Sequence, residues 1–309
     1  MTRQQALACR AAGACAAAVT LVTTAAAREG NGLQGRLAVG VTRENVEELY
    51  SLPASGGSTR MISRRGDGAT ASRPAWSPDG SQIAFASSSV AGSRIDLVEP
   101  DASRLRPLTR PRPRYAVFDG NPTWSRDGQF VRFNRTTVEG ETSTLTLRRV
   151  RPDGSGARTL WTNSDETRGE ILTLSPGGRK MLYSRHIDLD TREELFSANL
   201  DGSGTRRLTR SRTGTRIGNA VWSPNGRRIV YCAGPAATLD RLLWIVDADG
   251  SGARQLLRTR ASCALAWSPT GDWIAFGRDP AGLFAVRADG SGLRQIDPNL
   301  PATSLSWTR

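Results

Sequence analysis

A tandem repeat is the feature of this sequence that most restricts its fold. The motif Asp-Gly-Ser-Gly-x-Arg-x-Leu occurs in complete copies and in decayed ones, and successive copies start 46, 52, 48, 48 and 40 residues apart. The complete copies start at Asp153, Asp201, Asp249 and Asp289, and the decayed ones at Asp101 and Ser55. A period of this size is typical of radial β arrays, in which each repeat is a four-stranded sheet that cannot bury both faces by itself.

A second motif, Trp-Ser-Pro-x-Gly, alternates with the first and marks the end of one strand in each repeat. In the copy at 222–226 the proline fixes φ for a turn and the glycine tolerates the positive φ that the turn requires. Apolar residues recur three and five positions after this glycine, and again six and three positions before each repeat start and seven positions after it. These offsets predict the second, third and fourth strands. Four tryptophans at one site of the first strand are expected to fill the gap between adjacent sheets, with Leu174 at that site in one repeat: Trp76, Trp124, Trp222 and Trp267.

The two ends of the repeat array predict how it closes. The first repeat begins at Leu37 with a second strand, and the chain finishes at 303–307 with an unaccompanied first strand. Pairing these ends would complete one sheet and remove two exposed strand edges. We therefore predict an all-β fold, a six-bladed β-propeller whose first blade is closed by the C-terminal strand. The predicted units are Leu37–Ser63 with Thr303–Arg309, and then 72–109, 119–160, 169–209, 217–257 and 262–296.

These motifs resemble the WD-like propeller repeat of TolB and its relatives, which carry Trp-Ser-Pro-Asp-Gly and Asp-Gly-Ser; residues 76–80 match the first motif outright. The resemblance covers essentially everything after residue 27. It implies a periplasmic, non-enzymatic protein that makes protein contacts at the cell envelope. The same blades also occur in front of prolyl-oligopeptidase-type hydrolases.

The amino-terminal residues have the layout of a secretory signal. Arg3 and Arg10 precede a weakly apolar segment at 11–27 that ends in three alanines. We expect residues 1–27 to be a signal peptide, 28–36 a short leader and 37–309 the propeller, with a periplasmic or secreted location. The segment is short for a membrane span. An attached disordered leader and a lipid anchor at Cys15 are the alternatives.

The net charge of +13 invites comparison with nucleic-acid-binding proteins. The basic residues are almost all arginine and are spread by the repeat, one lying five positions after each repeat start. We therefore predict a solvated surface and no nucleic-acid partner. These arginines are Arg60, Arg106, Arg158, Arg206, Arg254 and Arg294.

Residues suited to catalysis or metal binding are few. His186, the single histidine, is expected in a loop between two strands, and no Gly-x-Ser-x-Gly motif accompanies it. Asp188 and Asp190 lack the spacing of a calcium loop. Cys232 and Cys263 are predicted to be buried free thiols, with a disulfide between adjacent repeats as the alternative. We expect no metal and no cofactor.

The candidate ligand site is the mouth of the central channel, because propellers usually bind where their innermost strands converge. Polar residues just ahead of the tryptophan site are the predicted binding residues: Arg73, Asp119, Asn121, Glu170 and Asn219. The alternative is that these residues line a hydrated channel that binds no specific ligand. The basic, aromatic segment 111–115 is a second candidate surface, which would dock an acidic partner. The alternative is that this segment is a linker stiffened by proline.

These observations favour an exported, non-enzymatic scaffold that binds a protein partner or an envelope ligand and is itself a monomer. One alternative is a propeller lyase or hydrolase that acts on carbohydrate or peptide and uses Asp119 and Glu170. Another is an accessory propeller to a separate oligopeptidase-type hydrolase.

Overall fold

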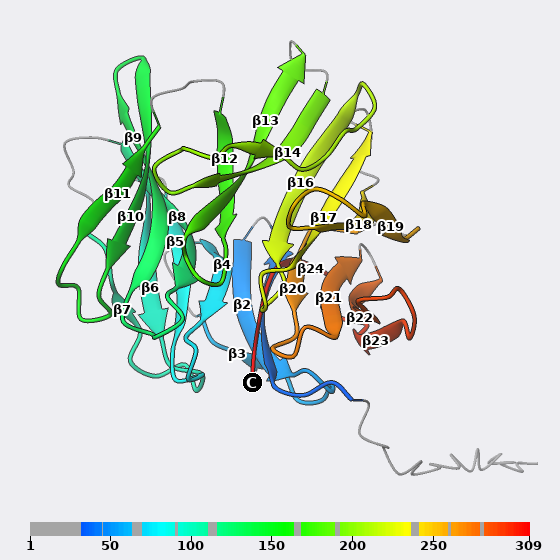
Figure 1. Ribbon diagram of the computed structural model, residues 1–309. Helices are drawn as coiled ribbons and strands as arrows, with labels where there is room; N and C mark the ends of the chain where they lie inside the picture. Colours follow the sequence, from blue (N-terminus) through cyan, green and yellow to red (C-terminus); the bar gives the residue numbers. More distant parts are fainter. Residues whose placement is uncertain are drawn as a thin grey trace, which may run out of the picture. The chain divides into compact units, whose positions relative to one another are not determined.

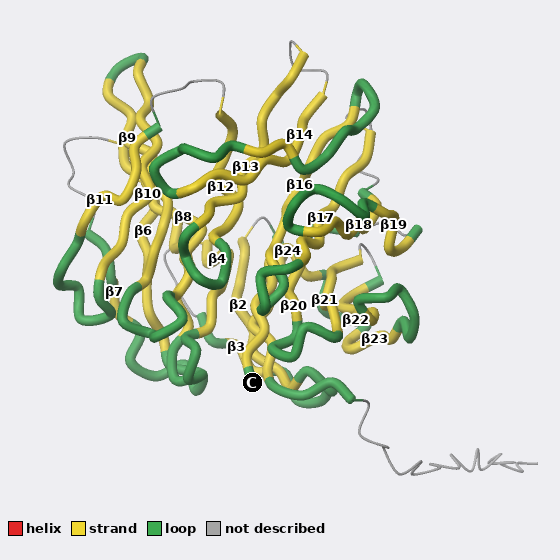
Figure 2. Tube along the Cα trace, in the orientation of Figure 1, coloured by secondary structure: helices red, strands yellow, loops and turns green. Residues whose placement is uncertain are grey.

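The computed structural model describes residues 32–44, 46–63, 70–89, 92–110, 116–163, 168–188, 192–235, 241–258, 261–278 and 281–309. The described residues form 24 strands joined by turns and loops, with no helix among them (Figures 1 and 2). The predicted signal peptide and residues 28–31 of the leader lie outside the described residues.

The strands follow the predicted repeats. Repeat 1 contains β1 (Arg36–Arg43), β2 (Val46–Pro53), β3 (Arg60–Met61) and the C-terminal β24 (Ala302–Thr308). Repeat 2 contains β4 (Thr70–Trp76), β5 (Ile83–Ser89), β6 (Gly92–Val98) and β7 (Arg106–Pro107). Repeat 3 contains β8 (Ala116–Trp124), β9 (Val131–Glu139), β10 (Thr142–Val150) and β11 (Arg158–Thr162). Repeat 4 contains β12 (Arg168–Leu174), β13 (Lys180–Asp188), β14 (Arg192–Asn199) and β15 (Arg206–Arg207). Repeat 5 contains β16 (Thr215–Trp222), β17 (Arg228–Pro235), β18 (Leu242–Asp247) and β19 (Arg254–Leu257). Repeat 6 contains β20 (Leu265–Trp267), β21 (Trp273–Arg278), β22 (Gly282–Arg287) and β23 (Arg294–Asp297).

The C-terminal strand completes the first sheet, as its sequence predicts. β24 pairs antiparallel with β1, with Trp307 opposite Leu37 and Leu305 opposite Val39. The sheet order is β24-β1-β2-β3. Figure 1 shows the red C-terminal strand beside the blue N-terminal strands. The amino-terminal edge of the repeat array is therefore covered by its own carboxyl end.

Repeats 2 and 3 differ from the prediction of six separate sheets, because they share one eight-stranded sheet. β7 pairs with β6 only opposite Asp96 and Leu97. The other end of β6 is left open, and there Gly92 and Ser93 pair in parallel with the start of β8. The short outer strand thus lets the next repeat add to the sheet, and the described residues form five sheets in all.

The core consists of six apolar clusters in the described residues, and each cluster lies between two consecutive repeats. The cluster between repeats 6 and 1 joins Leu37, Val39 and Trp307 to Ala266 and Leu283. The innermost strands contact one another in the same cyclic order: β4, β8, β12, β16, β20, β24 and again β4. Each repeat therefore buries its faces against its two neighbours, which gives an all-β, propeller-like arrangement.

The repeated tryptophans and arginines add hydrogen bonds between consecutive repeats. Trp124 and Trp267 donate from Nε1 to the carbonyls of Ala75 and Val221, at 3.0 and 3.2 Å. The repeat arginine begins the outermost strand of each repeat. Its guanidinium reaches the turn of the following repeat in three cases: Arg106 to Pro152 O at 2.8 Å, Arg206 to Asp249 O at 3.2 Å and Arg254 to Ala288 O at 3.0 Å. Three of the six repeat arginines thus join consecutive repeats.

Truncation of Trp307 tests the closure. This side chain is 9% exposed, packs in the cluster between repeats 6 and 1, and donates from Nε1 to Gln34 O at 2.8 Å. Trp307→Ala is expected to lower the free energy of unfolding by about 3 kcal/mol, the cost of a cavity in a packed core. Urea denaturation followed by circular dichroism measures the change. Leu105→Ala, at a side chain that is 36% exposed, is the control. Equal losses in the two variants would contradict the closure.

Turn aspartates predict how stability depends on pH. Asp249 and Asp289 each accept hydrogen bonds from the serine two residues later, which lower the pKa of both carboxyls. A lowered folded pKa adds stability above the unfolded pKa of about 4, and this stability is lost as pH falls through the folded pKa. Asp249→Asn with Asp289→Asn keeps an acceptor oxygen but cannot titrate. Melting temperatures from pH 6 to pH 2 should therefore fall less steeply in this variant, whereas Glu141→Gln, outside these turns, should follow the wild type.

Candidate functional site

A cavity of about 330 Å³ lies where the six innermost strands meet. Three of the predicted binding residues line it: Arg73 of β4, Asn121 of β8 and Asn219 of β16. β12 contributes Thr173, the segment before β20 contributes Cys263, and β24 contributes Ser304. The structure thus brings together side chains from all six repeats, as a channel mouth requires.

A bulge recurs at this position in the innermost strands. The register with the second strand shifts between Ser72 and Ala75, between Gly120 and Thr123, and at the equivalent places in repeats 4 and 5. Arg73 and Asn121 have positive φ, 53° and 51°. Asparagine tolerates this conformation, but it is uncommon for arginine and costs free energy that the surrounding structure must supply. β-Bulges redirect side chains, and these side chains line the cavity.

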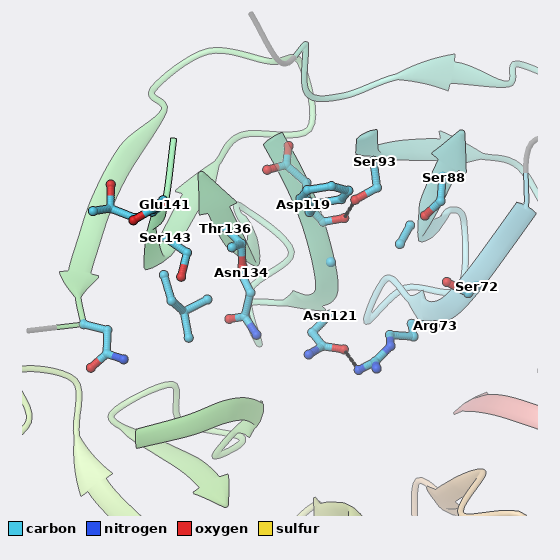
Figure 3. A pocket seen from close by; sticks show the side chains of 16 residues that line it. Ser72, Arg73, Ser88, Ser93, Asp119, Asn121, Asn134, Thr136, Glu141 and Ser143 are labelled. Atoms are coloured by element: carbon cyan, nitrogen blue, oxygen red, sulfur yellow. Dashed lines mark hydrogen bonds between the residues drawn. The ribbon is translucent and has the colours of Figure 1, made fainter. Parts of the chain in front are cut away.

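Hydrogen bonds connect the bulges of neighbouring repeats. The Arg73 N–H donates to Ser304 Oγ at 3.1 Å, and the Arg73 guanidinium donates to Asn121 Oδ1 (Figure 3). Asn121 Nδ2 then donates to Ile171 O at 3.0 Å. Repeats 1, 2, 3 and 4 are linked by this series, so Arg73 and Asn121 are held in place at the cavity wall.

Asn219 makes a similar link between repeats 5 and 6. Its Nδ2 donates to Cys263 O at 3.1 Å, and its backbone N–H donates to Cys232 Sγ at 3.2 Å. The predicted free thiols are wrong, because Cys232 and Cys263 form a disulfide with a Cα–Cα distance of 5.6 Å. A Cβ at Gly218 would overlap both sulfur atoms, so glycine leaves the room for the bridge. Sequence reasoning gave this disulfide only as the alternative, because nothing in the spacing shows this close approach.

Asp119 has a structural role that differs from the predicted one. It is 1% exposed, and Arg135 donates to both its carboxylate oxygens, from Nε at 2.6 Å and from Nη2 at 2.7 Å. Thr109 Oγ1 of the preceding repeat donates to it as well, at 2.6 Å. The carboxylate is therefore occupied by a bidentate ion pair and a hydroxyl. Its backbone borders a larger cavity, described below.

Four further predictions concern single residues or short segments. Glu170 lies in β12, but its side chain is outside the described part of the chain, as are the segment 111–115 and Asp190. His186 lies in β13 opposite Glu193, so its predicted loop position is wrong. The apolar pattern of β13 and β14 ends before His186, but the two strands go on pairing through the polar residues that follow. Asp188 ends β13.

A larger cavity of about 810 Å³ adjoins the central one and shares Arg73 and Asn121 with it. Neutral hydroxyl and amide side chains dominate its wall, and sequence reasoning identified only Asn121 among them. Figure 3 shows these side chains around the hollow: Ser72, Ser88, Ser93, Asn134, Thr136 and Ser143. The repeat offsets could not reveal them, because they lie on five different strands and no motif includes them.

Phe118 is the most informative residue of this wall. It lies on β8 and is 46% exposed, although a phenylalanine is usually buried in a fold of this kind. Ser93 Oγ donates to the Asp119 carbonyl at 2.8 Å, which fixes the backbone next to Phe118. An exposed aromatic ring among hydrogen-bonding groups has the composition of a binding surface.

Two properties of the described residues bear on the chemistry. No cluster of three His, Cys, Asp or Glu side chains is close enough to hold a metal ion within the described ranges. In the same part of the chain, no helix has the length and hydropathy needed to span a bilayer.

Comparison with known proteins places these features in a family. The family described as the TolB beta propeller domain matches residues 67–271. The fold resembles TolB from Acinetobacter baumannii (TM-score 0.68, 16% identity), with 89% of this chain and 66% of that chain covered. A putative TolB from Agrobacterium tumefaciens (TM-score 0.61, 16% identity) is covered over 99% of its length by 89% of this chain.

Enzymes also share the fold. An oligogalacturonate lyase in complex with manganese (TM-score 0.58, 14% identity) is matched over 85% of this chain and 74% of that chain. No curated protein sequence matches this chain. At such low identities the solved structures show the fold only, and this chain spans 66% of the length of the Acinetobacter protein.

Replacement of Asp119 distinguishes a structural from a catalytic carboxylate. Asp119→Asn keeps the shape but leaves the largely buried Arg135 guanidinium without its counter-charge, and should lower the free energy of unfolding by roughly 2–4 kcal/mol. Chemical denaturation measures it. Arg104→Gln, which breaks an ion pair whose arginine is 80% exposed, should cost less than about 1 kcal/mol. A stable Asp119→Asn protein would contradict the structural role.

Proposed function

Because this chain belongs to the TolB beta propeller domain family, we propose that it is an exported, non-enzymatic scaffold that binds a protein partner at the cell envelope. The six repeats would act as the six blades of a closed propeller. The cyclic order of contacts between the innermost strands and the six apolar clusters between consecutive repeats support this arrangement.

The proposed binding surface is the pair of adjoining cavities, one at the innermost strands and the other extending from β4 and β8 to β5, β6, β9 and β10. Arg73 and Asn121 belong to both cavities, and they are fixed by hydrogen bonds from one repeat to the next. A rigid wall reduces the conformational entropy that a partner would otherwise have to offset on binding. The wall is thus prepared to accept an extended segment of another protein.

Exposed Phe118 is the observation that carries the proposal. Its ring is 46% exposed and borders the 810 Å³ cavity, whose wall consists mainly of neutral hydroxyl and amide groups. Protein interfaces combine an aromatic anchor with surrounding polar groups that bond to the partner's backbone. A peptide segment suits this wall. It offers an apolar side chain to pack on Phe118, and backbone donors and acceptors to bond to the serine and asparagine side chains.

Binding is favoured over the alternative of a propeller lyase or hydrolase by the state of Asp119. That alternative needs a carboxylate free to exchange a proton, whereas both oxygens of Asp119 accept hydrogen bonds from Arg135. The oligogalacturonate lyase shares the fold with this chain at 14% identity, which supports no transfer of its activity.

Export rests on the sequence of residues 1–27, whose basic, apolar and small-residue parts follow the order of a secretory signal. The disulfide between Cys232 and Cys263 fits an oxidising compartment such as the periplasm. The resemblance to TolB implies the same compartment.

Affinity capture with a matched pair of variants tests the function. Immobilised wild-type protein should retain a defined protein from the envelope fraction of the cells that encode it. Phe118→Ser should reduce the retained amount at least about 10-fold, because removing an aromatic anchor costs 2 kcal/mol or more. Leu293→Ser, at a side chain that is 49% exposed and outside both cavities, should leave it unchanged. Equal capture by the two variants, or turnover of a glycan or peptide by the wild type, would contradict the proposal.

A further inference from the structure

A third cavity, of about 480 Å³, lies between repeats 2 and 3 and shares no lining residue with the two cavities above. Its walls come from the end of repeat 2, from β9 and β10, and from the turn that follows β10. Three guanidinium side chains line it: Arg110, Arg135 and Arg148. Such a concentration of arginine around one cavity requires an explanation beyond surface solvation.

Strand register places two of these arginines side by side. Arg135 of β9 is opposite Thr146 of β10, and Arg148 is two residues further along β10. Residues two apart in a strand point to the same face, so Arg135 and Arg148 are diagonal neighbours. Two cations in this arrangement repel each other unless an anion lies between or beside them.

Among the described residues, only one of these cations forms an ion pair with a carboxylate. Asp119 forms its bidentate pair with Arg135. Arg148 and Arg110 have no ion pair or hydrogen bond among the described residues, and the Nε of Arg148 is buried. Burial lowers the pKa of the Arg148 guanidinium, the positive charge of Arg135 lowers it further, and the negative charge of Asp119 opposes this only in part. Asp153, in the turn after β10, also lines the cavity, but its carboxylate already accepts a hydrogen bond from Ser155 N at 2.8 Å.

The remaining wall is apolar. Leu108, Phe133 and Val150, all 6% exposed or less, form part of the cavity lining. A volume of 480 Å³ lies in the range of small-molecule sites and exceeds what a single inorganic anion fills. The cavity therefore combines a cationic part with an apolar part.

We propose that this cavity binds an organic oxyanion, a phosphate or carboxylate group carried on a small apolar body, with Arg148 and Arg110 contacting the anionic group. Guanidinium groups present planar pairs of donors that match both oxyanions. The apolar body would pack on Phe133 and Val150. This site does not depend on the proposed binding of a protein partner, since the two surfaces have separate walls.

Calorimetric titration with four probes at one ionic strength tests the assignment. Phenyl phosphate and benzoate carry both parts of the ligand, inorganic phosphate carries the anion only, and phenol carries the apolar body only. We expect saturable binding of phenyl phosphate or benzoate, at least about 10-fold tighter than binding of either single-part probe. Tighter binding of phenyl phosphate identifies a phosphate ester as the ligand class, and tighter binding of benzoate identifies a carboxylate. Absence of saturable binding of both two-part probes, or inorganic phosphate binding as tightly as phenyl phosphate, would overturn the proposal.

A pair of neighbouring variants locates the site. Arg148→Gln should weaken binding of the tighter two-part probe about 10-fold or more, the usual effect of losing a hydrogen bond to a charged group. Arg149→Gln makes the same charge change one residue away, on the opposite face of β10, and should alter binding less than about 2-fold. Phe118→Ser should also leave binding unchanged, which separates this site from the proposed partner surface. Equal weakening by Arg148→Gln and Arg149→Gln would show a general charge effect and overturn the assignment.

A measurement on the wild type covers the case in which Arg148→Gln does not fold. Phenylglyoxal modifies accessible arginines, and mass spectrometry identifies each modified residue. Phenyl phosphate should protect Arg148 at least about 5-fold more than it protects Arg149, because a charge-assisted contact blocks only the contacted side chain. Equal protection of the two arginines would overturn the proposal.

Discussion

The cyclic burial of each repeat against two neighbours is the constraint on which the rest of this structure depends. A four-stranded sheet with two apolar faces is not stable by itself, and each of the six apolar clusters contains residues of two consecutive repeats. The cluster between repeats 6 and 1 needs Trp307 from the last strand and Leu37 from the first. The pairing of β24 with β1 therefore buries the two apolar faces that an open array would expose at its ends.

This closed packing explains how the candidate site can hold an unfavourable backbone. Arg73 has a φ of 53°, which an arginine rarely adopts, yet its neighbours on β4 include Trp76 and Ala71, both buried in the cluster between repeats 1 and 2. Packing around the bulge supplies the free energy that the strained residue costs. Hydrogen bonds to Ser304 and Asn121 then hold the side chain and backbone at the cavity. The scaffold thus positions polar groups that no isolated repeat could position.

Most of the fold could be predicted from the sequence because the packing of repeats imposes apolar residues at constant offsets. The offsets located the strands of all six repeats, and the unmatched ends predicted the pairing of β24 with β1. Features that depend on one pair of residues could not be predicted in this way. The disulfide needs the glycine at position 218 between two strands, and the ion pair of Asp119 needs Arg135 of a neighbouring strand. These two pairs do not recur from repeat to repeat, so the offsets could not reveal them. Three of the five predicted site residues line the central cavity, and Asp119 does not.

Departures from the repeat are where the proposed binding surfaces lie. The position of Asp119 is occupied by Ala71, Ile217 and Ala302 in three other repeats, and the position of Phe118 by Thr70, Arg216 and Pro301. The same junction between repeats 2 and 3 has the parallel pairing of β6 with β8, the 810 Å³ cavity and the arginine-lined cavity. The Asp119 backbone borders the first of these cavities, while its partner Arg135 lines the other. The recurring positions serve packing, whereas the junction between repeats 2 and 3 departs from the repeat. We therefore expect a ligand or partner to be recognised at this junction more than at the regular repeats.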